Sequence, residues 1–152
     1  MSNFRLVKEG VFVGPQPTAQ DLEDARQQGV KTVIDFRLPS ETGTSNEALV
    51  RSHGLDYTNI PVDKANLSAG QIGELDAAMQ STNGPFLLHC ATGLRAALLL
   101  ALSEARKNGW SAEQTFAHAQ RMEFDLKTSS TFASFVTQTM GQNDDLNSLR
   151  PA

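Results

Sequence analysis

The stretch PFLLHCATGLRAALLLAL, residues 85–102, contains the only cysteine of a chain of 152 residues. Residues 85–90 form a short apolar run after an Asn-Gly-Pro turn, which is typical of a buried strand. The apolar run that follows predicts a buried helix over residues 94–108. Cys90 is therefore expected where a buried strand ends, and Arg95 where the next helix begins.

Strand-like and helix-like segments alternate along the rest of the chain. The patterns predict further strands at residues 11–13, 30–36 and 55–61. Helices are predicted between Thr18 and Gly29, up to Val50, from Ser68 to about Met79, from Ser111 to about Met122 and from about Ser129 to Met140, with a polar loop at residues 38–46. Strands separated by helices favour an α/β fold, here a three-layer α/β/α arrangement around a small, mostly parallel sheet.

The length of the chain predicts one domain, which we place at residues 1–141, followed by a polar C-terminal tail at residues 142–152. Large apolar residues recur at roughly helical spacing in the last third of the chain, and we interpret them as core rather than as a substrate groove. They are Trp110, Phe116, Met122, Phe124, Phe132 and Phe135.

The composition excludes several classes of function. Thirteen basic and 17 acidic residues give a net charge of −4, which argues against a nucleic-acid or anionic-membrane surface. The longest apolar run, residues 96–102, is far shorter than the roughly 20 residues that span a bilayer. One cysteine and three scattered histidines predict no metal site, and we expect no cofactor. The first ten residues lack an apolar segment of signal-peptide length, so we expect a cytoplasmic protein.

The loop CATGLR, residues 90–95, has the composition of an anion-binding site. A loop that joins a strand to a helix directs its successive backbone N–H groups at one point. Gly93 allows the positive φ that such a loop needs, and Arg95 supplies a planar fork for two oxygens of an oxyanion. Helix N-termini and neighbouring cations also favour the thiolate form of a cysteine. We therefore interpret Cys90 as a nucleophile rather than as an inert buried thiol.

The motif HCATGLR resembles the phosphate-binding loop of the cysteine-dependent protein tyrosine and dual-specificity phosphatases. Together with the flanking runs VFVGPQPTAQDLEDARQQGVKTVIDFR and YTNIPVD, it resembles a bacterial phosphatase-like family that is also found fused to metallo-β-lactamase-like hydrolases. This resemblance covers about residues 4–120. It implies a cysteine-phosphatase fold and cleavage of a phosphomonoester, in a small molecule or a phosphoprotein, through a cysteinyl-phosphate intermediate.

The resemblance also implies roles for individual residues. Cys90 would attack phosphorus, and the loop Ala91, Thr92, Gly93, Leu94 and Arg95 would bind the phosphoryl oxygens. Asp63 lies where dual-specificity phosphatases place their general acid, although a turn residue paired with the next lysine is an equal alternative.

Two further residues are candidates for a supporting role. His89 matches the histidine that hydrogen-bonds beneath the loop in the resembled phosphatases, and a buried histidine without such a function is the alternative. Arg37 follows a strand end and could line the same edge of the sheet. We favour for Arg37 a structural ion pair with Asp35 or Glu41.

Two departures from the phosphatase pattern keep a second function open. Four residues separate Cys90 from Arg95, whereas the phosphatases have five, and the shorter spacing resembles single-domain rhodaneses that carry a persulfide. Ala96 replaces the serine or threonine whose hydroxyl helps the thiolate leave, a role that Thr92 could take instead of capping the loop. The alternatives are therefore a sulfurtransferase that uses Cys90 and a non-catalytic anion-binding module.

Overall fold

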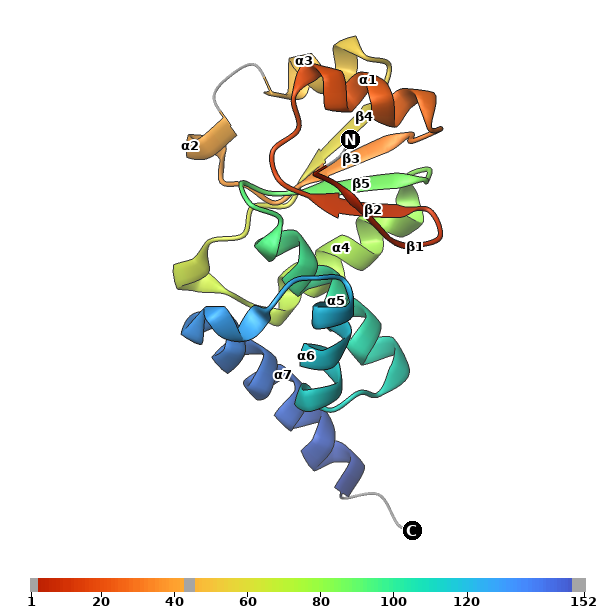
Figure 1. Ribbon diagram of the computed structural model, residues 1–152. Helices are drawn as coiled ribbons and strands as arrows, with labels where there is room; N and C mark the ends of the chain where they lie inside the picture. Colours follow the sequence, from red (N-terminus) through yellow and green to blue (C-terminus); the bar gives the residue numbers. More distant parts are fainter. Residues whose placement is uncertain (1–2, 43–45, 149–152) are drawn as a thin grey trace.

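The computed structural model describes residues 3–42 and 46–148, and their side chains except those of residues 42 and 142–148. Within these residues five strands form one sheet in the order β1-β2-β5-β3-β4 (Figure 1). The strands are β1 (Arg5–Lys8), β2 (Val11–Gly14), β3 (Thr32–Asp35), β4 (Asp56–Asn59) and β5 (Phe86–His89). β1 is antiparallel to β2 and the other pairs are parallel, which confirms the mostly parallel sheet.

The edge strand β1 was not predicted. It has four residues, and three of them are exposed, so its sequence lacks the apolar run that marks the buried strands. Gly10, with φ of +79°, turns the chain between β1 and β2, a conformation that glycine adopts without steric cost.

Helices cover both faces of the sheet, which confirms the three-layer arrangement. They are α1 (Ala19–Gln27), α2 (Pro39–Thr42), α3 (Asn46–Ser52), α4 (Ala69–Ser81), α5 (Leu94–Asn108), α6 (Ala112–Arg121) and α7 (Ser130–Ser148), with the 3-10 helices η1 (Lys64–Asn66) and η2 (Leu126–Thr128). Figure 1 shows α1 and α3 on one face of the sheet and α4 and α5 on the other. α6 and α7 pack on the side of α5 that points away from the sheet.

Capping boxes begin two of the helices at the residues from which the sequence predicts them, Thr18 and Ser111. Thr18 Oγ1 accepts a hydrogen bond from the Asp21 amide at 3.0 Å, and Asp21 accepts one in return from the Thr18 amide at 2.9 Å. Ser111 and Gln114 make the same reciprocal pair at the start of α6. Each such cap stabilises the helix by about 1 kcal/mol, so these helix starts are local properties of the sequence.

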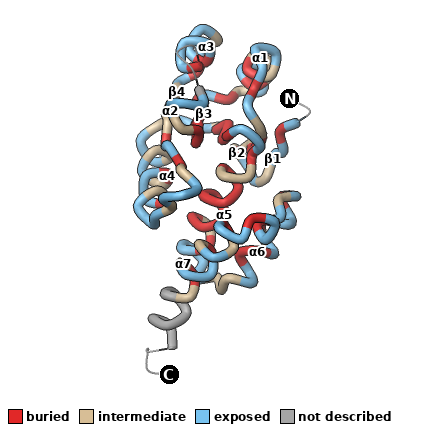
Figure 2. The backbone as a smooth tube through the Cα atoms, turned by 90° about the vertical axis from the view of Figure 1, so that its left-hand side faces the viewer, coloured by how far each residue is buried: buried red, intermediate tan, exposed pale blue. Residues whose placement is uncertain are grey.

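The predicted buried helix is the centre of the core. Every residue from Ala96 to Leu102 in α5 is at most 1% exposed, and Figure 2 shows this helix buried in the middle of the molecule. Burial of one leucine side chain contributes roughly 1.5–3 kcal/mol, so α5 is firmly fixed against β2 and β5. Because α5 is fixed, its first turn holds Arg95 at a defined place relative to the sheet. Phe116, Met122 and Phe132 are buried as predicted.

Two predicted element boundaries differ clearly from the structure. The predicted loop at residues 38–46 contains α2, since proline is favourable in the first turn of a helix. α7 continues past Met140 to Ser148. The domain boundary at residue 141 therefore lies inside α7, and the end of the predicted tail, residues 149–152, lies outside the described residues. None of the helices in the described ranges has the length and apolar character needed to cross a bilayer.

Candidate active site

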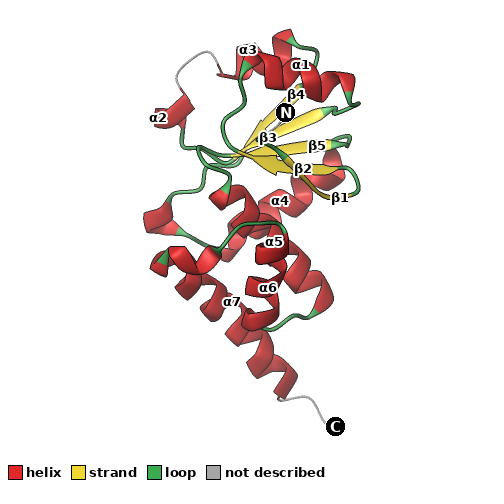
Figure 3. Cartoon of the chain, in the orientation of Figure 1, coloured by secondary structure: helices red, strands yellow, loops and turns green. Residues whose placement is uncertain are grey.

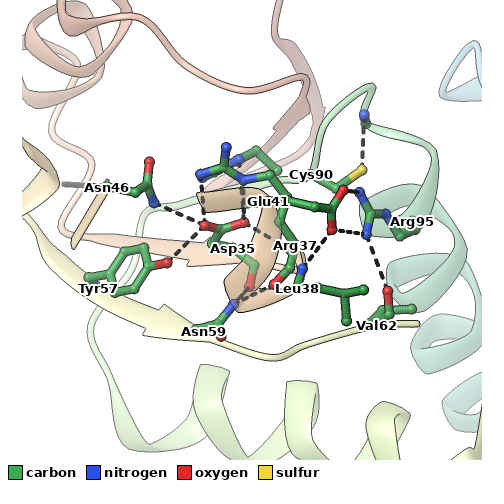
Figure 4. Close-up of polar contacts among 12 residues, drawn as sticks. Asp35, Arg37, Leu38, Glu41, Asn46, Tyr57, Asn59, Val62, Cys90 and Arg95 are labelled. Carbon is green, nitrogen blue, oxygen red and sulfur yellow. Dashed lines mark hydrogen bonds and ion pairs between the residues drawn. The ribbon is translucent and has the colours of Figure 1, made fainter. Parts of the chain in front are cut away.

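The loops that follow β3, β4 and β5 leave the sheet at the same edge, as the sequence predicts (Figure 3). Cys90 directly follows β5 and is fully buried. Its sulfur accepts a hydrogen bond from the Gly93 amide at 3.1 Å (Figure 4). This contact fixes the position of the sulfur at the floor of the loop, directly below the start of α5.

Only glycine fits at position 93 of the loop. Its φ is +98°, and a Cβ atom there would lie 2.9 Å from Phe124 Cε1 and 3.1 Å from the carbonyl carbon of Gly14. The predicted positive φ is therefore present, and close packing adds a second requirement for glycine. The neighbouring Thr92 hydroxyl accepts a long hydrogen bond of 3.4 Å from the Leu94 amide, which is the capping alternative for this residue.

Arg95 opens α5, and two partners fix its guanidinium. Nη1 donates to Glu41 Oε2 at 2.8 Å and to the Val62 carbonyl at 3.2 Å, and Nη2 donates to Glu41 Oε1 at 2.8 Å. These bonds use three of the five N–H groups of an arginine. Among the described residues, the Nε–H group and the second Nη2–H group have no oxygen acceptor. They lie on the same edge of the guanidinium and form a fork of the kind that can accept two oxygens of an oxyanion.

Glu41 is the side-chain partner of Arg95, which the sequence does not reveal, since there Glu41 is only a possible partner of Arg37. It lies on α2, and its carboxylate accepts a 2.7 Å hydrogen bond from the Leu38 amide. The hydrogen bonds from Arg95 lower the pKa of Glu41 to about 2, although partial burial acts in the opposite direction. The hydrogen bond to Glu41 also raises the pKa of Arg95, although partial burial acts in the opposite direction. A proline followed two residues later by glutamate is a helix-start signal, which could have indicated α2.

Arg37 makes the ion pair with Asp35 that the sequence favours. Its Nε and Nη2 atoms donate to the two carboxylate oxygens of Asp35, each at 3.0 Å. Asp35 also accepts hydrogen bonds from the Tyr57 hydroxyl at 2.8 Å and from Asn46 Nδ2 at 2.9 Å. Although burial favours the neutral acid, the hydrogen bonds from Arg37 hold the pKa of Asp35 below its usual value. The pair is fully buried, not at the surface, and it braces the end of β3 (Figure 4).

His89 lies beneath the loop but is turned toward this ion pair. Its Nδ1 atom is 3.8 Å from Asp35 Oδ1, and within the described residues neither ring nitrogen has a hydrogen-bond partner. The hydrogen bond expected beneath the loop is therefore not among the contacts of His89. Burial lowers the pKa of His89 to about 4, and the Asp35 charge and the nearby Cys90 backbone oppose this effect only in part. The imidazole is consequently neutral at physiological pH.

Asp63 follows Val62, whose carbonyl accepts a hydrogen bond from the Arg95 side chain. Both Asp63 oxygens are engaged at the start of η1. Oδ1 accepts from the Ala65 amide and Oδ2 accepts from Asn66 Nδ2, each at 2.9 Å. These hydrogen bonds lower the pKa of Asp63, the Ala65 amide most strongly. Asp63 thus follows a contact of Arg95 in the chain, and its own hydrogen bonds favour the carboxylate form.

The site therefore combines a buried sulfur facing an N–H group with an arginine fork of fixed orientation. Such a pair suits attack on a tetrahedral oxyanion. In the described ranges no group of three or more histidine, cysteine, aspartate or glutamate side chains is placed to bind a metal ion.

Comparison with known protein families gives a match over most of the chain. The family described as "Beta-lactamase hydrolase-like protein, phosphatase-like domain" matches residues 3–107. A Beta-lactamase hydrolase-like protein of Xylella fastidiosa is 28% identical over an alignment of 125 residues, and the match covers 79% of this chain and 29% of that protein. The chain therefore spans less than a third of the length of this curated relative.

Solved structures share the fold. A DUF442 protein from Shewanella putrefaciens superposes with a TM-score of 0.77 at 23% identity, covering 93% of each chain. P. aeruginosa TpbA, solved as a cysteine-to-serine variant in complex with pTyr, gives a TM-score of 0.67 at 18% identity and covers 91% of this chain and 90% of its own. The resemblance predicted from HCATGLR and its flanks is confirmed. The chain belongs to the phosphatase-like domain family of the Beta-lactamase hydrolase-like proteins.

Proposed function

We propose that this chain is a cysteine-dependent phosphatase that hydrolyses a phosphomonoester through a cysteinyl-phosphate intermediate. The observation that carries the proposal is the combination of the Gly93 amide on the Cys90 sulfur with the open fork of Arg95 in one short loop. The family description supports it, as does the complex of the similar TpbA fold with pTyr. The substrate is accordingly a phosphorylated compound, either a small molecule or a phosphoprotein.

The proposed reaction has two steps at one phosphorus atom. The Cys90 thiolate attacks phosphorus, an S–P bond forms, and the bond from phosphorus to the leaving oxygen breaks while Arg95 holds two of the remaining oxygens. Water then attacks phosphorus, gives up a proton, and displaces the thiolate as inorganic phosphate forms. Ala96 offers no hydroxyl to the departing thiolate, so the Gly93 N–H group is the stabilising contact on sulfur.

Steady-state phosphate release from an aryl phosphate tests the proposal. Cys90→Ser should abolish turnover and still bind orthophosphate, whereas Arg95→Lys should weaken orthophosphate binding, because lysine cannot form the two-pronged contact. Since Cys90 is the sole cysteine of the chain, no second thiol can replace it in the variant. Equal turnover by wild type and Cys90→Ser would contradict the proposal.

We propose that Asp63 donates the proton to the leaving oxygen when the leaving group is poor, as in an alkyl phosphate. Because its hydrogen bonds favour the carboxylate, we expect an aryl phosphate, which leaves without a proton, to be the better substrate. Asp63→Asn should lower turnover of an alkyl phosphate about 100-fold and that of an aryl phosphate only about twofold. Activity on the alkyl ester should rise toward acidic pH as Asp63 gains its proton. Equal losses on both esters would remove Asp63 from the role of general acid.

One observation favours a second candidate, a sulfurtransferase. Only four residues lie between Cys90 and Arg95, the spacing that resembles single-domain rhodaneses. In that case Cys90 attacks the outer sulfur of thiosulfate, sulfite leaves, and the resulting persulfide passes its sulfur to cyanide as thiocyanate. A Cys90-dependent gain of one sulfur atom after incubation with thiosulfate, without any phosphatase activity, would establish this candidate in place of the first.

A further inference from the structure

A cavity separate from the cysteine loop lies between η1 and the start of α7, which run side by side in Figure 1. Its volume is about 400 Å³, within the range of small-ligand sites. The lining consists of Lys64, Ala65 and Leu67 from the η1 segment and Ser130, Thr131, Ser134, Phe135 and Gln138 from α7. These described residues supply one ammonium, three hydroxyls and one amide, with no carboxylate among them. The lining therefore suits a negatively charged group.

The charge of Lys64 is available to a ligand. Lys107 and Lys127 pair with Asp76 and Glu113, whereas no carboxylate of the described residues pairs with Lys64. The Lys64 ammonium lies 5.4 Å from the centroid of the buried Phe132 ring. This cation–π contact holds the ammonium against the first turn of α7, beside the hydroxyls that line the cavity.

The η1 segment that lines the cavity is joined along the chain to a contact of Arg95. Arg95 donates to the Val62 carbonyl at 3.2 Å, and the chain continues from Val62 through Asp63 directly into η1. Consecutive Cα atoms are about 3.8 Å apart, so the Cα atom of Lys64 lies within about 8 Å of that of Val62. A substrate that extends from the Arg95 fork past Val62 would bring a second group to the Lys64 ammonium.

We infer that the cavity between η1 and α7 binds a second phosphate group, carried by the leaving-group part of the substrate. Lys64 supplies the charge, and the hydroxyls of Ser130, Thr131 and Ser134 supply donors to several phosphate oxygens. The inference rests on the proposed function and narrows it to substrates that bear two or more phosphate groups.

Calorimetric titration of the Cys90→Ser protein tests the inference without turnover. The probes are orthophosphate, pyrophosphate and tripolyphosphate. We expect a polyphosphate to bind about tenfold more tightly than orthophosphate, because a second charged group gains hydrogen bonds. Adding Lys64→Met or Ser134→Glu should remove this gain and leave orthophosphate binding within about twofold. Lys127→Met is the matched control, since Lys127 also lies over an aromatic ring, Phe116, and should retain the gain.

The outcomes separate this inference from the proposed function. If orthophosphate binds but polyphosphates bind no better, or if the gain survives both Lys64→Met and Ser134→Glu, the second phosphate site is wrong and the proposed function stands. An equal loss of the gain in polyphosphate affinity in Lys127→Met would also contradict the second phosphate site. The gain would then depend only on the net charge of the protein. Failure of the Cys90→Ser protein to bind any of the three anions would contradict the proposed function itself.

Discussion

At the residue scale, the contacts of Glu41 decide how Arg95 presents its guanidinium. An arginine side chain has many rotamers, and an unbound fork would lose conformational entropy each time it gripped a ligand. Glu41 and the Val62 carbonyl hold three of its N–H groups, so the two that remain face one direction before a ligand arrives. We infer that Glu41 is a positioning residue, which would act on a phosphoryl ligand through Arg95.

Glu41→Gln should lower kcat/KM for an aryl phosphate by about 10- to 100-fold, because it removes the charge that orients the fork. Glu41→Asp should also give a kcat/KM below the wild-type value, since the shorter side chain cannot reach both Nη1 and Nη2 of Arg95. Glu47→Gln on α3, which breaks the exposed pair with Arg51, is the control and should leave kcat/KM unchanged. If Glu41→Gln behaved like that control, the guanidinium would not depend on Glu41.

At the scale of elements, the site is a junction between β5 and α5 that only glycine can make. The core fixes both elements, so the loop between them cannot relax to accept a side chain at position 93. The bend that brings the Gly93 amide onto the Cys90 sulfur is the same bend that needs a positive φ.

Gly93→Ala should therefore destabilise the protein by roughly 2–5 kcal/mol, from the left-handed backbone and the contacts of the new Cβ with Phe124 and Gly14. Gly109→Ala at the end of α5 has a similar positive φ and nothing within 4 Å of a Cβ, so it should cost only about 1–2 kcal/mol. Urea unfolding measures both values. Equal losses in the two variants would mean that close packing at Gly93 is unimportant.

The elements also show what the sequence can and cannot predict. The strands at Cys90 and Asp35 and the capped helices were predictable, because apolar runs and capping boxes are local signals. β1 was missed because it is a short, exposed edge strand. Glu41 was missed because its contact with Arg95 spans 54 positions in the sequence, and no local pattern encodes a pairing that only the assembled sheet creates.

At the scale of the whole molecule, the buried imidazole of His89 beneath the site makes the free energy of unfolding depend on pH. His89 is neutral in the folded protein, with a pKa of about 4, whereas an unfolded histidine titrates at about 6.5. Between these values the unfolded chain binds the additional proton. Stability is therefore full above about pH 6.5 and falls as the pH drops toward 4.

The wild-type free energy of unfolding should decrease by about 3 kcal/mol between pH 7 and pH 4 on account of His89 alone. His89→Gln should remove most of the loss between pH 6.5 and about 5, above most of the range in which carboxylates titrate. His118, a half-buried histidine whose pKa burial also lowers, is the control, and His118→Gln should retain most of the loss. An unchanged pH profile in His89→Gln would show that the buried imidazole does not carry this dependence.

The central claim, that Cys90 carries phosphate during turnover, is tested most directly by rapid acid quenching followed by intact-mass spectrometry. The wild-type protein, mixed with an aryl phosphate and quenched within one turnover, should carry one phosphoryl group on the peptide that contains Cys90. The Cys90→Ser protein should carry none. Phosphate release by the wild type without any such adduct, or an adduct that persists in Cys90→Ser, would contradict the account.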